Sequence, residues 1–300
     1  MRIVFAGNNP RGAACLRGLL SAGHEILGAL VHPGAENSDV ARDAAAAGIA
    51  VEAPEDVNDP AVVDALAALA PDVIVLAGYG QIVRASVLTL APHGCLNLHA
   101  GKLPQYRGSS PLNWVLINGE DEFTISVIQA AAGVDTGDVL RERTFPIGPE
   151  DTIADLHATA NGAFPELLVE TLAAAEARTL EPRRQEDAEA AYYPLRFPDD
   201  GLLVWDLVTA EQAHNRIRAL AHPYPNAFTF HGSRRLALRR SRPALPPFHG
   251  EPGRVYRING NELLVCASDR CVWVEPDDAA GIDRYDRLAT ARGLLLQEPR

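Results

Sequence analysis

The sequence predicts an α/β protein with a mostly parallel sheet, followed by a small β-barrel. Two observations predict this fold class. Apolar strand-like runs alternate with helical patterns in the first part of the chain, and short β runs separated by Gly, Pro and Asn turns follow later. The chain has 300 residues, enough for two medium domains, and an average apolar share of 47%. We expect a catalytic domain over 1–178, a linker over 179–202 and a second domain over 203–300.

The elements of the first domain follow from local patterns. Expected strands are apolar runs that end in turn residues, and expected helices repeat apolar residues every three or four positions. The strands are expected at 2–6, 25–31, 50–52, 72–77, 95–98, 123–129 and 138–146. The helices are expected at 11–22, 38–48, 59–70 and 111–118, and from 152 onward, where Thr152 and Asp155 form a capping-box pattern.

The second domain begins with a helical pattern and continues with short strands. The helix is expected at 209–221, and the β runs lie at 226–231, 235–240, 252–258, 261–266 and 271–275. Short strands at this spacing, separated by turn residues, are typical of a small barrel.

The net charge of −12 argues against wholesale binding of nucleic acid or an anionic membrane. The charge is uneven: 1–202 carry 13 Lys+Arg against 28 Asp+Glu, a net of −15, whereas 203–300 carry 14 against 11, a net of +3. Much of the basic excess lies in one strand-like run, Arg234–Arg242. These arginines either form the solvated face of a strand or hold a nucleotide diphosphate, and the sequence does not decide their role.

The sequence also predicts where the protein works. No apolar run approaches the roughly 20 residues that span a bilayer, and the N-terminus is typical of a strand rather than a signal peptide. We therefore expect a cytoplasmic protein without membrane contact. The four cysteines lack a CxxC pair, which predicts reduced buried thiols and neither a zinc site nor disulfides.

A glycine turn after the first strand raises the question of a dinucleotide site. In the run from Gly7 to Gly12, Asn9 stands where the middle glycine would let a pyrophosphate approach. The second expected strand also ends without an acid for a ribose hydroxyl. We therefore exclude a nicotinamide-dependent dehydrogenase.

The segment 95–138 carries the chemistry. Asn97 and His99 are two residues apart on an expected strand, so their side chains share a face and both can donate hydrogen bonds. Open α/β sheets place their sites at such strand ends. Asp135 and Asp138 flank a Gly turn before the next strand, and a returning carboxylate could set the tautomer of His99.

The same segment resembles the 10-formyltetrahydrofolate-dependent formyltransferase family, which includes enzymes acting on methionyl-tRNA, glycinamide ribonucleotide and amino sugars. The matching residues are Asn97-Leu98-His99-Ala100, Leu103-Pro104, Tyr106-Arg107-Gly108, Pro111 and Asp135-Thr136-Gly137-Asp138. The resemblance covers the whole chain. It implies a Rossmann-like catalytic domain and an OB-like C-terminal barrel.

The resemblance implies transfer of a formyl group from 10-formyltetrahydrofolate to a primary amine through a tetrahedral oxyanion, with no metal. Asn97 and His99 would stabilise the oxyanion, and Asp135 would orient His99 and help to accept the amine proton. By resemblance, the pterin would lie in an apolar slot that involves Leu76, Gly78, Tyr79, Gly80, Gln81, Ile82, Gly133, Val134 and Asp138.

Three further residues are expected to bind the acceptor: Lys102, Arg107 and Ser109. Arg107 either binds an acceptor carboxylate or phosphate, or forms an internal pair. Gly101 and Lys102 replace the Ser-Leu pair that is usual in the family, which predicts a more flexible loop.

The stretches 111–120, 197–200 and 214–228 resemble the formyltransferase half of the bifunctional enzyme that acts on UDP-4-amino-4-deoxy-arabinose.

 

The main expectation for the acceptor is therefore an amino sugar, in the first place a nucleotide-linked one, or a similar small metabolite. The alternative is methionyl-tRNA. Relatives that act on tRNA carry a basic insertion after the second strand, whereas this chain has the short and slightly acidic stretch 33–39. Two other classes stay open, a nucleic-acid-binding barrel with an inactive catalytic domain and a folate sensor without turnover. The sequence leaves the oligomeric state undecided.

Overall fold

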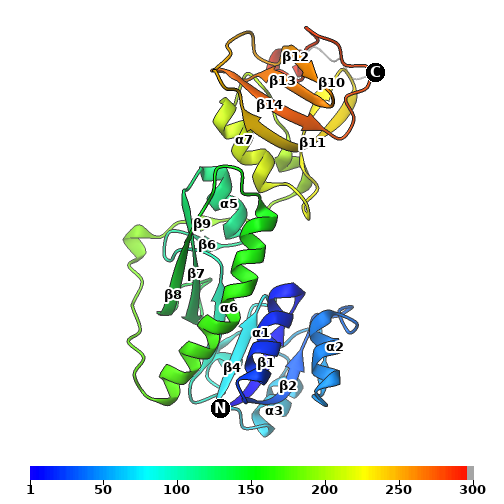
Figure 1. The fold of residues 1–300 in the computed structure, drawn as a ribbon. Coiled ribbons are helices and arrows are strands. Elements are labelled where there is room, and N and C mark those ends of the chain that lie inside the picture. The colour runs from blue at the N-terminus through cyan, green and yellow to red at the C-terminus, as the bar shows by residue number, and fades with distance from the viewer. Residues whose placement is uncertain (296–300) are drawn as a thin grey trace. The chain divides into compact units, whose positions relative to one another are not determined.

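The structure of the chain, a computed structural model, describes residues 1–295, and its contacts divide the chain into two compact units (Figure 1). Unit 1 comprises Met1–Gly108, Phe123–Phe145 and Ala158–Tyr193. Unit 2 comprises Ser109–Glu122, Pro146–His157 and the described chain from Pro194 onward. The division therefore does not follow a single cut in the sequence, and the domain boundaries expected at 178 and 203 stay a prediction.

Unit 1 is built on a seven-stranded sheet with the order β3-β2-β1-β4-β5-β7-β8. Its strands are β1 (Arg2–Gly7), β2 (Glu25–Leu30), β3 (Val51–Glu52), β4 (Val73–Ala77), β5 (Cys95–His99), β7 (Glu122–Gln129) and β8 (Val139–Pro146). The strands from β3 to β5 pair in parallel, and β7 pairs antiparallel with β5. The expected mostly parallel sheet is confirmed.

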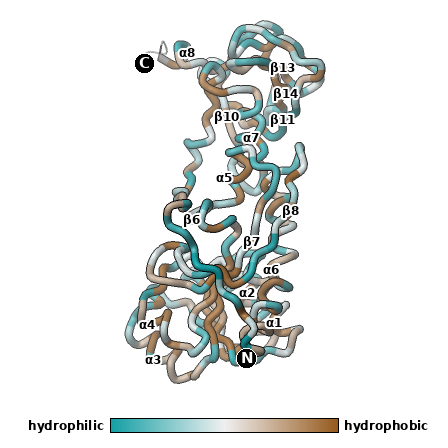
Figure 2. The backbone as a smooth tube through the Cα atoms, turned by 90° about the vertical axis from the view of Figure 1, so that its left-hand side faces the viewer, coloured by the Kyte–Doolittle hydropathy of each residue, from teal (hydrophilic) through white to brown (hydrophobic). Residues whose placement is uncertain are grey.

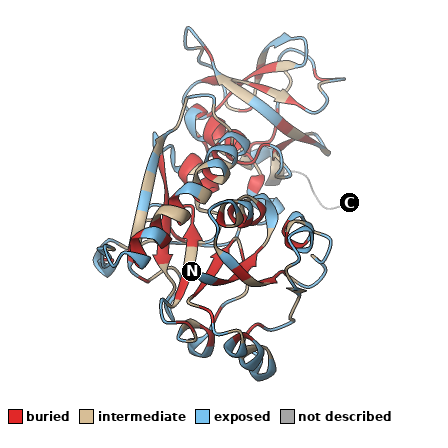
Figure 3. Cartoon of the chain, turned by 60° about the horizontal axis from the view of Figure 1, so that its bottom comes forward, coloured by how far each residue is buried: buried red, intermediate tan, exposed pale blue. Residues whose placement is uncertain are grey.

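Helices cover this sheet because its central strands are apolar on both faces. The helices of the first half are α1 (Asn9–Ser21), α2 (Asp39–Ala46), α3 (Pro60–Ala68) and α4 (Ala85–Leu88), and α6 (Ile153–Glu176) follows later. On one face, Val4 and Ile74 pack with Leu66 of α3 and Val87 of α4. The neighbouring strand residues alternate to the other face and are also buried. The central strands are hydrophobic in Figure 2 and buried in Figure 3.

The stretch expected to be a linker packs on unit 1 as far as Tyr193. Its short strand β9 (Tyr192–Tyr193) pairs in parallel with β6 (Arg107–Gly108), and Arg183 forms a β-bridge with Val139. A 3₁₀ turn, η1 (Asp187–Glu189), lies between them. The sequence predicted none of these elements, because two-residue strands carry no periodic pattern.

Unit 2 contains α5 (Pro111–Asn118), the 3₁₀ turn η2 (Pro198–Gly201), α7 (Ala210–Ala219) and α8 (Ala291–Leu295). Its strands are β10 (Ala227–His231), β11 (Arg234–Pro243), β12 (Val255–Asn259), β13 (Glu262–Cys266) and β14 (Cys271–Pro276). They form an antiparallel sheet with the order β10-β11-β14-β13-β12. Within the described residues, no ladder joins the edge strands β10 and β12.

The helix boundaries follow the capping residues that the sequence contains. Helix α5 has the predicted bounds, and its C-terminal residue is followed by Gly119 in the left-handed conformation, with φ 76°. At the start of α6, the Asp155 carboxylate accepts hydrogen bonds from the Thr152 N–H at 2.8 Å and its hydroxyl at 2.6 Å. These bonds lower the pKa of Asp155, since they favour its ionised form.

Candidate functional site

The candidate site lies at the carboxyl end of β5, where Asn97 and His99 meet Asp135. The Asn97 Nδ2 donates to Asp135 Oδ1 at 3.3 Å, and His99 Nδ1 lies 3.5 Å from Asp135 Oδ2. Asp135 Oδ2 also accepts a hydrogen bond from the Gly108 N–H at 2.9 Å. The structure therefore brings together the three residues for which the sequence predicts a catalytic role.

His99 is held from both sides of its ring. Its Nε2 lies 2.5 Å from the carbonyl oxygen of Tyr106, and its Nδ1 faces the Asp135 carboxylate. Both partners accept hydrogen bonds, so the ring satisfies both of them when both nitrogens carry a proton. The side chain is only 6% exposed. The orientation of the His99 ring beside Asp135 is thus fixed by contacts at both nitrogens.

Gly101 follows the catalytic strand and packs tightly. A Cβ built on it would lie 2.7 Å from His99 Nε2 and 2.8 Å from the Tyr106 carbonyl oxygen. Its own carbonyl accepts a hydrogen bond from Ser126 Oγ at 3.1 Å. Glycine therefore serves here for close packing against His99, and the expected gain in loop flexibility stays a prediction.

The turn that carries Asp135 also depends on a glycine. Asp135 has φ 52°, in the left-handed region that Asp tolerates better than most residues. A Cβ on Gly137 would lie only 1.6 Å from the Gln129 carbonyl oxygen. The close approach of this turn to β7 explains the glycine in the D-T-G-D motif.

A cavity of about 180 Å³ opens beside Asn97 and Asp135 in unit 1. It is lined by Leu76, Tyr79, Gly80, Gln81, Ile82, Val83, Asn97, Ile128, Ala130, Ala131, Ala132, Gly133, Val134 and Asp135. Two of its apolar side chains are exposed, Ile82 by 71% and Val134 by 51%. The cavity is lined mostly by apolar residues, with Asn97 and Asp135 among its few polar ones, which suits an aromatic ring that carries a reactive substituent.

Tyr79 gives independent support for a ligand in this cavity. Its buried hydroxyl has no hydrogen-bond partner among the described residues, which costs free energy unless a ligand or water supplies one. Burial raises the pKa of Tyr79 to about 12, so the hydroxyl stays a donor at neutral pH. The His32 ring packs edge-on against Tyr79, and its Nε2 accepts from the Gly80 N–H at 2.8 Å.

Several expected binding residues lie elsewhere. Gly78 and Asp138 do not line the cavity, since Gly78 turns the chain with φ 69° and the Asp138 carbonyl accepts from the Gln129 N–H. Lys102 is exposed and also lies outside the cavity lining. Ser109 is exposed and belongs to unit 2.

Arg107 forms the internal pair that was one of its two expected roles. The side chain is 2% exposed, with Nε donating to Gln185 at 3.0 Å and Nη1 to the Tyr192 hydroxyl at 3.0 Å. Its Nη2 lies 3.0 Å from Asp187 Oδ1, an ion pair without hydrogen-bond geometry. The guanidinium is therefore engaged within unit 1.

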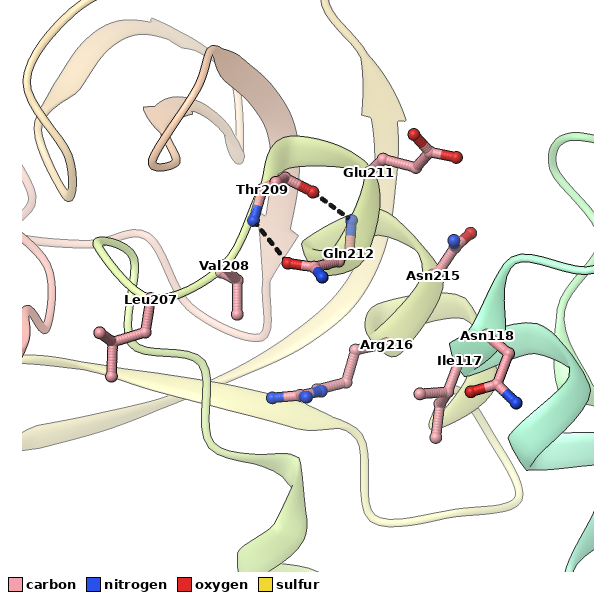
Figure 4. Close-up of a pocket in the computed structure, with 9 residues that line it drawn as sticks. All are labelled: Ile117, Asn118, Leu207, Val208, Thr209, Glu211, Gln212, Asn215 and Arg216. Carbon is pink, nitrogen blue, oxygen red and sulfur yellow. Dashed lines mark hydrogen bonds between the residues drawn. The ribbon is translucent and has the colours of Figure 1, made fainter. Parts of the chain in front are cut away.

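Unit 2 holds a larger cavity, of about 660 Å³ (Figure 4). Its labelled residues are Ile117, Asn118, Leu207, Val208, Thr209, Glu211, Gln212, Asn215 and Arg216. The dashed lines in Figure 4 mark the capping box of α7, in which Thr209 and Gln212 exchange two hydrogen bonds. The Arg216 guanidinium donates to the Leu202 carbonyl at 3.3 Å. These polar groups serve the fold of unit 2.

Several residues in two of the stretches that suggested an amino-sugar acceptor are buried in unit 2, whereas 197–200 are exposed. Asn113 of α5 is 1% exposed and donates to the Ala219 carbonyl of α7 at 2.7 Å. His214 and Arg218 are buried, and both contact backbone carbonyls, among them those of Pro149 and Gly148. Asn113, His214 and Arg218 therefore serve the packing of unit 2, so their match to a sugar-directed relative does not by itself identify the acceptor.

All four cysteines are buried free thiols, as predicted, and burial raises the pKa of Cys15 and of Cys95 to about 12. The described residues contain no cluster of three potential metal ligands. No helix in residues 1–295 is both long and apolar enough to cross a membrane.

The fold and the site define a folate-dependent N-formyltransferase. The chain belongs to the formyl transferase family, which it matches over residues 1–172, with the family's C-terminal domain matched over 197–288. Membership of this family assigns 10-formyltetrahydrofolate as the formyl donor.

Known relatives cover nearly the whole chain. The methionyl-tRNA formyltransferase of Solibacter usitatus is 35% identical over 99% of this chain and 97% of that protein. The enzyme of the same name from Geobacter sulfurreducens is 36% identical over 99% of this chain and 95% of that protein. The fold is similar to that of WlaRD, a sugar 3N-formyltransferase, with a TM-score of 0.72 and 17% identity over 93% of this chain and 98% of that one.

These relatives overturn the expected acceptor. Six curated relatives that are 32–36% identical over nearly their full length are named methionyl-tRNA formyltransferases, whereas the sugar enzyme shares only the fold. The expectations of an amino-sugar acceptor and of tRNA as the weaker candidate are wrong. A net charge summed over 1–202 does not describe the electrostatic field at one local surface. The lack of a basic insertion likewise does not determine the acceptor.

Proposed function

We propose that this chain formylates the amino group of methionyl-tRNA. The observation that carries the proposal is the 32–36% identity, over at least 97% of this chain, to relatives named for that activity. A tRNA acceptor also suggests a cytoplasmic location. The domains expected at 1–178 and 203–300 would then share the work of catalysis and RNA binding.

The donor would place its pterin ring in the cavity of unit 1. At about 180 Å³ the cavity is smaller than the roughly 300–1,000 Å³ of sites that take a whole drug-sized ligand, so part of the donor would extend beyond it. The unpartnered Tyr79 hydroxyl would bond to a polar edge of the ring, and Ile82 and Val134 would cover its face. Asn97 and Asp135 would face the formyl group.

The catalytic residues would act on the two substrates as follows. The amine nitrogen forms a bond to the formyl carbon, and the C–N10 bond breaks with its electron pair going to N10, which takes up the proton that the amine loses. One Asn97 N–H bonds Asp135, and the other is available to the oxygen that becomes negative. The Asp135 carboxylate accepts the amine proton, directly or through water, and the His99 ring beside it holds that carboxylate in place.

The arginines of β11 supply positive charge for an RNA backbone. The register shifts between Leu238 and Arg240, and this β-bulge leaves Arg239 and Arg240 both exposed on one cavity of about 480 Å³ in unit 2. Neither makes an ion pair with a residue in the described part of the chain, whereas Arg242 pairs with Glu262 at 2.8 Å. Acidic residues also line the cavity, Glu150 and Glu275 among them.

The proposal is tested by incubating the protein with 10-formyltetrahydrofolate and initiator methionyl-tRNA, followed by mass spectrometry of the released amino acid. We expect methionine to gain one CO unit only when both substrates and the enzyme are present. Uncharged tRNA and free methionine are the negative controls. Donor turnover without any formylated methionine would overturn the proposed acceptor.

The double variant Arg239→Ala/Arg240→Ala will bind tRNA more weakly and with less salt dependence. Each lost phosphate contact lowers the slope of log Kd against log salt by about 1. The matched control is Arg141→Ala/Arg143→Ala, which removes the same charge from arginines that are already paired with Glu166 and Glu170 in unit 1. Equal slopes for the two double variants in a filter-binding titration would argue against RNA contact at β11.

A further inference from the structure

Gln185, in the stretch expected to be a linker, touches the catalytic turn. The side chain is 6% exposed. Its Nε2 donates to the Asp135 carbonyl at 2.8 Å and to the Gly137 carbonyl at 2.6 Å. Both amide hydrogens of Gln185 are therefore used on the two carbonyls that flank Thr136.

The orientation of the Gln185 amide follows from its partners. Its Oε1 accepts a hydrogen bond from Arg107 Nε at 3.0 Å. A guanidinium only donates, and the two carbonyls only accept, so the flipped amide would face a like partner on both sides. Arg107 is in turn fixed by the Tyr192 hydroxyl and by Asp187. One buried network thus connects residues 185–192 to the catalytic turn.

The turn needs this support. Asp135 has φ 52°, a conformation that costs a non-glycine residue free energy and persists only where surrounding contacts fix it. The Asp135 side chain must reach Asn97, His99 and the Gly108 N–H at the same time. A shift of the turn by an ångström would break this arrangement.

We infer that Gln185 is a positioning residue, which holds the backbone of the Asp135 turn so that its carboxylate stays aligned with Asn97 and His99. The inference rests on the proposed catalytic role of Asp135. Gln185 itself does not line the cavity beside Asn97 and so acts through Asp135. The segment around Gln185 is then part of the catalytic unit and not a passive connection.

Three variants and a double-mutant cycle test the inference. Gln185→Glu keeps the acceptor for Arg107 but cannot donate to the turn, and Gln185→Met removes all three bonds with little change in shape. Thr171→Val is the matched control, because it removes one buried hydrogen bond, to the Leu167 carbonyl, from α6 of the same unit. The cycle combines Gln185→Glu with Asp135→Ala.

We expect Gln185→Glu and Gln185→Met to lower kcat in methionyl-tRNA formylation by about 10- to 100-fold, the range for a small misplacement of a catalytic group. Thr171→Val will keep kcat within about threefold. In the Asp135→Ala background, Gln185→Glu will lower kcat no further, since no carboxylate remains to be positioned. A merely structural role would lower kcat by the same factor in both backgrounds, which would overturn the inference.

Hydrogen–deuterium exchange of residues 133–138 gives a readout that needs no acceptor. We expect faster exchange in Gln185→Glu and in Gln185→Met than in the wild type or in Thr171→Val, and unchanged exchange would overturn the inference. Different results would contradict the proposed function and the proposed role of Gln185. A wild type that transfers no formyl group to methionyl-tRNA contradicts the proposed function, whereas an active Gln185→Glu variant with an inactive Asp135→Ala variant contradicts only the role of Gln185.

Discussion

Asp135→Asn will lower kcat by about 10²–10⁴-fold, the contribution typical of a positioned general base. The amide keeps the size of the carboxylate and can still accept the hydrogen bond from the Gly108 N–H. It cannot take up the proton of the attacking amine, and it no longer places a carboxylate 3.5 Å from His99 Nδ1. Single-turnover kinetics with saturating donor and methionyl-tRNA will measure the chemical step directly.

The same turn offers a matched control. Asp138→Asn makes the same chemical change three residues away, but Asp138 lies outside the cavity lining and is held through its backbone carbonyl. We expect this variant to keep kcat within about threefold. If both variants lost activity equally, the turn as a whole and not the Asp135 carboxylate would be responsible.

The catalytic residues could be predicted from the sequence because their signals are local. Asn97 and His99 are two positions apart on an apolar run, so they share a face of any strand that forms there. Asp135 is flagged by its Gly turn and by the family motif. The contact with β7 that places this turn near β5 comes from an antiparallel pairing, Asn97 opposite Ile128, and no local pattern encodes it.

Gln185 could not be predicted in the same way. It lies in a polar stretch without periodicity, and its role depends on Arg107 and Asp135, which are 78 and 50 residues away along the chain. Arg107 itself shows the same limit, since a motif arginine can bind a substrate or an internal partner. Only the burial of its guanidinium beside Gln185 separates these alternatives.

The acceptor was mispredicted because summed charge is a poor measure of a binding surface. Arg239 and Arg240 lie in a chain with a net charge of −12, but the β-bulge in β11 exposes both on one cavity of unit 2. Interactions between exposed charges are largely screened beyond about 10 Å at moderate salt, so the charges that share the cavity, Glu150 and Glu275 included, set the local field at these arginines. The local arrangement of charged side chains therefore describes a binding surface better than the net charge of the chain does.

Gly137→Ala will lower both stability and activity. The new Cβ would lie 1.6 Å from the Gln129 carbonyl oxygen, so the turn must move or the hydrogen bond between the Gln129 N–H and the Asp138 carbonyl must break. Overpacking of this kind costs about 1–3 kcal/mol in the free energy of unfolding. Because the Gly137 carbonyl also accepts from Gln185, we expect kcat to fall by about 100-fold, as for a misplaced catalytic group.

Gly162→Ala makes the same substitution in unit 1, but we expect it to have the opposite effect on stability. Gly162 lies inside α6 and has no atom within 4 Å of an added Cβ, so alanine will raise the free energy of unfolding by about 0.5–1 kcal/mol through helix propensity. Its kcat will match the wild type. Urea denaturation and formylation kinetics on the two variants will measure both effects. If Gly137→Ala were as stable and active as Gly162→Ala, the close approach of the turn to β7 could not be what selects glycine in the D-T-G-D motif.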